Sequence, residues 1–78
     1  MKENSDKINI IVGKRLKELR ELKNLTQAQL AADVNIEISQ ISRIERGVIN
    51  TSIGSLFSIL IALDLSLKDF FSEGFEKI

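Results

Sequence analysis

The sequence predicts an all-α fold, a compact bundle of five helices formed by a single domain over residues 1–78. With 78 residues, the chain is too short for two hydrophobic cores. Its apolar residues recur with the three-and-four spacing of a helix face, and no segment alternates as a strand would. Residues typical of helix caps separate the apolar segments, so each helix can be assigned in turn.

The first helix is expected over residues 7–23. Ser5 or Asp6 can cap its start, and Asn24 can adopt the left-handed conformation that closes a helix. Charged residues, Arg15 among them, occupy the faces that are predicted to meet solvent. The apolar residues of the predicted buried face are Ile8, Ile11, Val12, Leu16, Leu19 and Leu22.

The second and third helices are short and closely spaced. Thr26 and Gln29 have the spacing of a capping box, in which each side chain accepts a hydrogen bond from the backbone N–H of the other residue. The helix that starts there is expected to stop at Asn35, a residue that tolerates a positive φ. After a turn of about three residues, a third helix is expected over residues 38–46, with Gly47 just past its end.

Residues 27–46 thus form a helix-turn-helix, whose second helix can enter the major groove of DNA. On a helical wheel, Ile41 and Ile44 mark the buried side of that helix, and a polar face lies opposite them. Arginine presents a bidentate fork that matches guanine, and serine can donate or accept at several base edges. A polar face that is only solvated is the open alternative. The face holds Ser39, Ser42, Arg43 and Arg46.

The fourth and fifth helices complete the bundle. Residues 53–63 are apolar almost all the way round, which indicates a helix covered on more than one side. Ser66 can cap a short fifth helix that carries Phe70 and Phe71, and residues 72–78 are expected to form a frayed tail. The predicted core consists of Leu16, Leu19, Leu30, Ala31, Val34, Ile41, Ile44, Leu56, Leu60 and Leu63.

Composition argues against an enzyme. The chain has no cysteine and no histidine, which removes thiol chemistry and the most common general base and zinc ligand. We therefore expect no catalytic residues, no metal site and no cofactor. No apolar run approaches the roughly 20 residues that span a bilayer, and residues 1–7 do not resemble a signal peptide, so a cytoplasmic, nucleoid-associated protein without membrane contact is expected.

Two motifs at the matching distance, TQAQLA and ISQISRIERG, resemble the Cro/C1-type helix-turn-helix family, also called the xenobiotic-response-element family. Upstream VGKRLKELRELKNL and downstream SIGSLFSILIALDLSLKDFF resemble the flanking helices of that family. The resemblance implies a lambda-repressor-like DNA-binding domain over residues 7–71. Stand-alone controller proteins of restriction-modification systems are a similar class of short regulator.

The resemblance also implies roles for individual residues. Residues expected to meet base edges are Ile38, Ser39, Ser42 and Arg43, with Ser42 near the sugar-phosphate wall. Residues expected to contact phosphates are Gln27, Gln40, Arg46, Asn50 and Thr51. For Gln40, a solvent-facing role explains the position equally well. Arg20 and Glu45 are expected to form an ion pair that ties the first helix to the end of the third.

The sequence departs from the family pattern at three places. Asn35 and Asp64 stand where the family often has glycine, and residues 48–50 lack the lysine or arginine often found there. The net charge is zero, with eleven basic and eleven acidic residues. We therefore expect weaker non-specific DNA affinity and a shallower salt dependence than a strongly basic domain would show.

The function predicted from these features is sequence-specific binding of double-stranded DNA by a transcriptional regulator. The expected active form is a homodimer on a palindromic operator. Two alternatives stay open: an antitoxin-type autorepressor that also binds a toxin, and an adaptor that binds protein instead of DNA. RNA polymerase and a cognate toxin are further partners under these alternatives. The predicted dimer interface consists of Ile59, Ile61, Leu67, Phe70 and Phe71.

Overall fold

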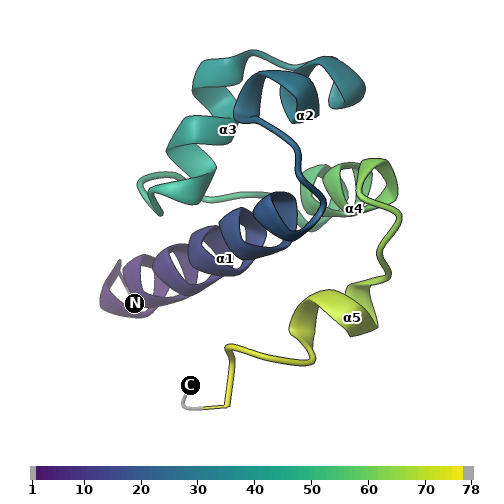
Figure 1. Ribbon diagram of the computed structural model, residues 1–78. Coiled ribbons are helices and arrows are strands. Elements are labelled where there is room, and N and C mark those ends of the chain that lie inside the picture. Colours follow the sequence, from purple (N-terminus) through teal and green to yellow (C-terminus); the bar gives the residue numbers. More distant parts are fainter. Residues whose placement is uncertain (1, 77–78) are drawn as a thin grey trace.

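The computed structural model describes residues 2–76, and within that range the chain forms five helices and no strand (Figure 1). The helices are α1 (Lys2–Leu22), α2 (Gln27–Val34), α3 (Ile38–Glu45), α4 (Ile53–Ala62) and α5 (Leu67–Phe71). Figure 1 shows α1 crossing the middle of the domain, with α2 and α3 on one side of it and α5 on the other. The predicted all-α five-helix fold is confirmed.

All five helices contribute to one core. Burying an aliphatic or aromatic side chain of this size contributes about 1.5–3 kcal/mol, so this cluster is the main source of stability. Val34, which the pattern placed in the core, is partly buried and packs against its edge. The buried members are Leu16, Leu19, Leu30, Ala31, Ile41, Ile44, Leu56, Ile59, Leu60, Leu63 and Phe70.

The helix ends follow local chemistry. The Thr26 hydroxyl accepts from the Gln29 amide at 3.0 Å, and the Gln29 side chain accepts from the Thr26 amide at 2.8 Å, so the predicted capping box is present. A second capping box joins Ser66 and Asp69 at the start of α5. Helices α1 to α4 each end within two residues of a left-handed backbone conformation, with φ between 57° and 72°. The left-handed residues are Asn24, Asn35, Gly47 and Asp64.

Two expectations about the ends of the chain were wrong. The first helix begins at Lys2, so Ser5 and Asp6 lie inside it; the polar segment contains no proline or glycine that would stop the helix. Residues 72–76 are not a frayed tail, because Phe75 returns to pack against Phe70 with ring centroids 5.7 Å apart. Residues 77–78 lie outside the described range.

Candidate nucleic-acid interface

The third helix is held against α1 by close backbone contact. A Cβ atom added at Gly13 would lie 2.3 Å from the carbonyl oxygen of Ile44, and one added at Gly47 would lie 2.6 Å from the Cα of Ile10. Both distances are too short for a real side chain, so only glycine permits this approach. The consequence is a fixed position for the C-terminal end of α3 on the surface of α1.

The outward face of α3 is polar, as the helical wheel predicted. Ile41 and Ile44 are buried on the opposite side, while Ser39 and Arg43 are exposed and Ser42 is half-buried. Ile38, at the first position of the helix, is half-exposed. The structure therefore brings the four predicted base-contacting residues together on the open side of one two-turn helix.

A buried carboxylate ties three helices together. Glu45, at the end of α3, accepts from Nε and Nη2 of Arg20 at 2.6 and 2.9 Å, which is a bidentate contact. The same carboxylate accepts from Nε2 of Gln27 at 3.0 Å. Arg20 also donates through Nη1 to the carbonyl of Leu25 at 2.7 Å. The hydrogen bonds from Arg20 to Glu45 raise the pKa of the guanidinium further above its usual value.

Gln27 takes part in this network. The family resemblance implies that this residue contacts phosphate and braces the third helix, and the structure shows its amide bracing the end of α3 from the first turn of α2. Gln27 remains half-buried at the surface, so part of the side chain is accessible. The helix-turn-helix is thus held both through its turn and through Glu45.

The remaining predicted phosphate contacts, apart from Gln40, lie in the segment between the end of α3 and the start of α4. Asn50 is exposed and accepts a hydrogen bond from Nδ2 of Asn9 on α1 at 2.7 Å. Arg46 is exposed and donates back to the carbonyl of Ser42 at 3.3 Å. Thr51 is half-buried just before α4. Asn9 had no recognisable signal in the sequence, because its role depends on how α1 crosses this loop.

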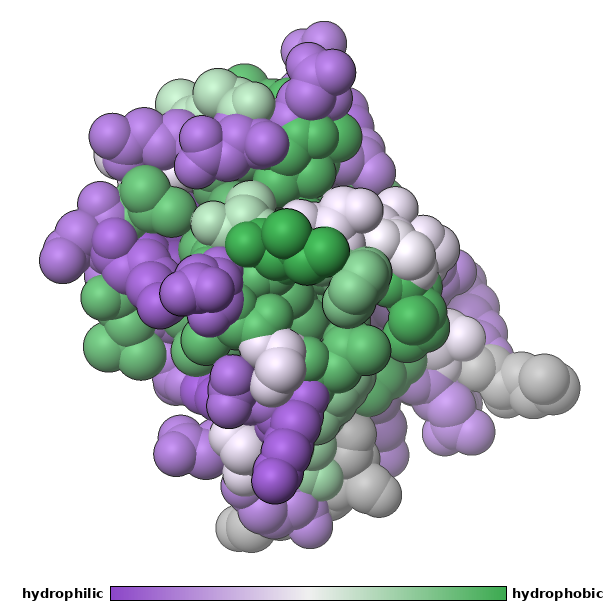
Figure 2. All heavy atoms as spheres, turned by 90° about the vertical axis from the view of Figure 1, so that its right-hand side faces the viewer, coloured by the Kyte–Doolittle hydropathy of each residue, from purple (hydrophilic) through white to green (hydrophobic). Residues whose placement is uncertain are grey.

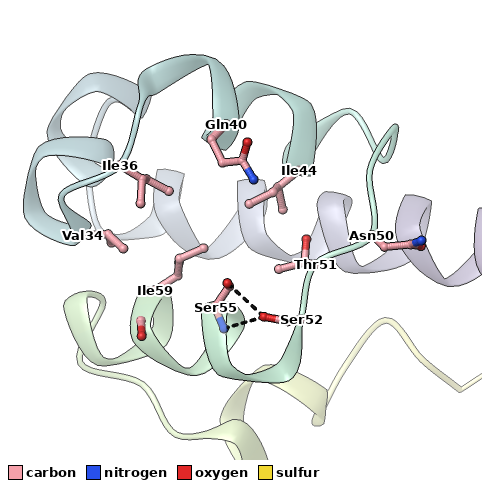
Figure 3. Close-up of a pocket in the computed structure, with 10 residues that line it drawn as sticks. Val34, Ile36, Gln40, Ile44, Asn50, Thr51, Ser52, Ser55 and Ile59 are labelled. Carbon is pink, nitrogen blue, oxygen red and sulfur yellow. Dashed lines mark hydrogen bonds between the residues drawn. The ribbon is translucent and has the colours of Figure 1, made fainter.

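Gln40 faces a different environment from the other polar residues of α3. Figure 3 shows its side chain pointing from α3 towards α4, over a hollow of about 220 Å³ between the two helices. Ile44 and Ile59 line the apolar part of the hollow, and Ser52 and Ser55 line its α4 side. Ser52 caps α4 by accepting from the amide of Ser55 at 3.0 Å. The hollow therefore lies between α3 and the N-terminus of α4.

Comparison with known proteins identifies this arrangement. The sequence profile of the helix-turn-helix (HTH) family matches residues 16–70, which include all of α2, α3 and α4. The chain belongs to this family of Cro/C1-type HTH proteins. The predicted resemblance is confirmed.

Two relatives are named as control or controller proteins, and one of them is named as a restriction-modification controller. The HTH domain resembles the solved controller protein C.AhdI from Aeromonas hydrophila, with a TM-score of 0.77 and 33% identity over 81% of this chain and 96% of that one. It is 36% identical to the control protein C.MunI from a Mycoplasma species, over 85% of this chain and 90% of that protein.

A further relative is an uncharacterised HTH-type transcriptional regulator of Rickettsia conorii, 35% identical over 91% of this chain. The chain spans 56% of the length of that regulator.

Within residues 2–76, the HTH protein has no group of three acidic or other ligating side chains that could hold a metal ion. In that same range, no helix is long and apolar enough to cross a membrane.

The predicted dimer interface needs correction. Ile59 is only 1% exposed and Phe70 is fully enclosed, so both belong to the core of the HTH domain and are unavailable to a partner. Leu67 is half-buried against that core. Ile61 and Phe71 are exposed, as an interface residue must be. The segment that forms α4 is apolar on nearly every side, so its sequence pattern does not distinguish inward from outward positions.

The structure also exposes two apolar residues of α4 that the sequence analysis did not assign to a surface. Ile53 is 65% and Phe57 49% exposed, and with Ile61, at 61%, they recur every four residues along one side of α4. We call Ile53, Phe57 and Ile61 the α4 stripe. Figure 2 shows hydrophobic surface gathered in the middle of the face that lies at the right of Figure 1, where α4 is found.

Proposed function

We propose that this HTH protein binds specific sequences of double-stranded DNA and regulates transcription as a homodimer on a palindromic operator. The observation that carries the proposal is the open polar face of α3, held in place by the buried carboxylate of Glu45. A helix that reads bases must keep a fixed orientation, and burial of a bidentate, three-donor network supplies that rigidity. Arg43, exposed at the centre of the face, is the residue proposed to read guanine.

Phosphate contacts are proposed on both sides of α3. Gln27 would contact one strand from the start of α2, while Arg46, Asn50 and Thr51 would contact the other near the N-terminus of α4, whose free amides attract anions. Gln40 would meet the backbone at the edge of the hollow. These contacts position the domain and carry no sequence information themselves.

The α4 stripe supports the homodimer. Its three large apolar side chains lie exposed along one side of a single helix. Contiguous apolar surface of this kind commonly marks an interface. Ile61 of the earlier prediction lies within the stripe, and exposed Phe71 on α5 is proposed to extend the contact. We place the interface there, in place of Ile59 and Phe70.

A controller role is the regulator class that the comparisons favour. The match to C.MunI covers most of both proteins, and the fold matches C.AhdI over nearly its whole length. This supports a regulator that acts in a restriction-modification context. Which genes it controls, and whether it represses or activates them, depends on the position of its operator.

Selection of duplexes from a random pool tests the proposal directly. We expect the protein to enrich a palindromic motif, and sedimentation to show a dimer at micromolar concentrations. Enrichment of no motif, or a motif without two-fold symmetry, would contradict the proposal. An adaptor that binds only protein would bind no duplex even at low salt.

A further inference from the structure

A buried arginine on α1 caps the far end of the domain from the recognition helix. Arg15 is only 8% exposed, although its position in the sequence pattern placed it on a solvent-facing side. Its Nε donates to the carbonyl oxygen of Phe70 at 2.8 Å, and its Nη2 donates to that of Asp69 at 2.9 Å. These carbonyls belong to the last turn of α5, where that of Asp69 also accepts from the backbone N–H and the hydroxyl of Ser72 at 3.3 and 2.8 Å.

Acidic side chains complete the surroundings of this guanidinium. Nη1 of Arg15 pairs with the carboxylate of Glu18 on α1 and lies 3.8 Å from Oε2 of Glu73, which follows α5. The arginine therefore has partners on α1, on α5 and in the segment after α5. A single planar group holds all three together, which the point charge of a lysine could not do with the same geometry.

Aromatic packing holds the same segment from the apolar side. After Gly74, which has a φ of 91°, the chain turns so that Phe75 meets Phe71 with ring centroids 4.8 Å apart. Phe70 and Phe71 are themselves 5.0 Å apart in an edge-to-face arrangement. Residues 72–76 are thus anchored to α5 by rings and to α1 by Arg15.

Helix α1 consequently carries two arginine clamps, five residues apart. Arg20 fixes the end of α3, the helix proposed to read DNA, and Arg15 fixes the end of α5. Phe71 of α5 belongs to the apolar surface proposed for dimer contact. The orientation of α3 relative to a partner subunit therefore depends on how rigidly α5 is held to α1.

We propose that Arg15 is a positioning residue that sets the distance between the two recognition helices of the dimer. It acts by locking α5 and residues 72–76 onto α1, the helix that also locks α3. The inference rests on the proposed homodimer. Without the guanidinium, each α3 keeps its Glu45 network and its own half-site contacts, while the angle between subunits loosens.

Arg15→Lys tests this inference because lysine keeps the charge but loses the two parallel hydrogen bonds. The probes are a half-site duplex and palindromes with varied spacers, all based on the motif selected by the wild-type protein and titrated by fluorescence anisotropy. The wild type should favour one spacing about tenfold over spacings that differ by one or two base pairs. Arg15→Lys should keep half-site affinity within about threefold and lose most of that preference.

Two further variants make the result specific. Lys17→Ala removes an exposed positive charge from the same helix and should leave the spacing preference unchanged. Phe75→Ala loosens the same segment without changing charge and should weaken the preference in the direction of Arg15→Lys. Thermal unfolding of each variant reports its folded fraction under the binding conditions.

The outcomes separate the inference from the function beneath it. If Arg15→Lys retains the wild-type spacing preference, or loses half-site and whole-site affinity in parallel, Arg15 only stabilises the fold and the inference is overturned. A wild-type protein that stays monomeric, or binds half-sites with no preferred spacing, overturns the homodimer and the inference together.

Discussion

The α2–α3 region and the α4–α5 region are built with the same devices but expose opposite chemistry. A capping box starts α2 and another starts α5, and α1 reaches each region through an arginine, Arg20 or Arg15. Yet α3 presents a polar face, whereas α4 presents an apolar stripe. Helix α1 is therefore a common frame, to which one surface for reading DNA and one for self-association are proposed to be attached.

Loss of the Glu45 carboxylate should have the largest effect, a loss of stability in the α2–α3 region that is proposed to read DNA. Glu45→Ala leaves the guanidinium of Arg20 buried without its bidentate partner, so we expect a loss of about 3–5 kcal/mol in unfolding free energy. Urea denaturation measures it. Asp33→Ala, at an exposed acidic residue of α2, is the control and should change stability by less than about 0.5 kcal/mol. Equal effects of the two substitutions would show that the network is unimportant.

A charge in the α4 stripe should weaken the proposed dimer contact of the α4–α5 region, while the α2–α3 region stays folded. Phe57→Glu places a carboxylate in the proposed interface and should weaken dimerisation by about 2–4 kcal/mol. Sedimentation equilibrium measures the dissociation constant. Ala32→Glu, which adds the same charge on the exposed side of α2, should leave it unchanged. Unaltered dimers of Phe57→Glu would place the interface elsewhere.

Arg43→Ala and Arg46→Ala test whether base contacts and phosphate contacts of the helix-turn-helix are separate. Arg43→Ala should lose about 1–3 kcal/mol of binding to the selected site and relax the preference at one base. Arg46→Ala should weaken binding to specific and unrelated duplexes by a similar factor, because phosphate contacts are alike in all sequences. Anisotropy titrations with both duplexes distinguish them. Identical behaviour of the two variants would refute the separation of base and phosphate contacts.

Acid should affect the α5 capping box slightly. Hydrogen bonds from the backbone N–H and hydroxyl of Ser66 lower the pKa of Asp69 from its usual 3.8. A carboxylate whose pKa is depressed on folding stabilises the fold above its unfolded pKa, and that contribution disappears as pH falls through the folded value. Asp69→Asn should therefore reduce the drop in melting temperature below pH 4. An unchanged acid profile would show that the box contributes no pH dependence.

Local signals in the sequence were enough to place most of the fold. Thr26, Ser66, Asn35 and Gly47 mark helix ends through short-range hydrogen bonds or backbone preference, which act the same way in any tertiary context. The start of α1 was missed because residues 2–6 combine a cap-like composition with nothing that forbids a helix. Its true boundary depends on propagation from the packed part of the helix.

The candidate site was partly predictable for a different reason. The Arg20–Glu45 pair followed from family resemblance, and the structure confirms it. Burial of Ile59 against exposure of Ile61 could not be read from a helix that is apolar almost all round. The burial of Arg15 could not be predicted either, since nothing in the sequence of α1 indicates that the C-terminal end of α5 packs against this side chain.

A titration of the wild-type protein with its selected palindrome tests whether a dimer of this protein reads DNA through α3. We expect two chains per duplex and, at physiological salt, an affinity for the palindrome that exceeds the affinity for a scrambled duplex by about a thousandfold or more. Equal affinity for selected and scrambled duplexes, or one chain per palindrome, would contradict a dimer that reads DNA through α3.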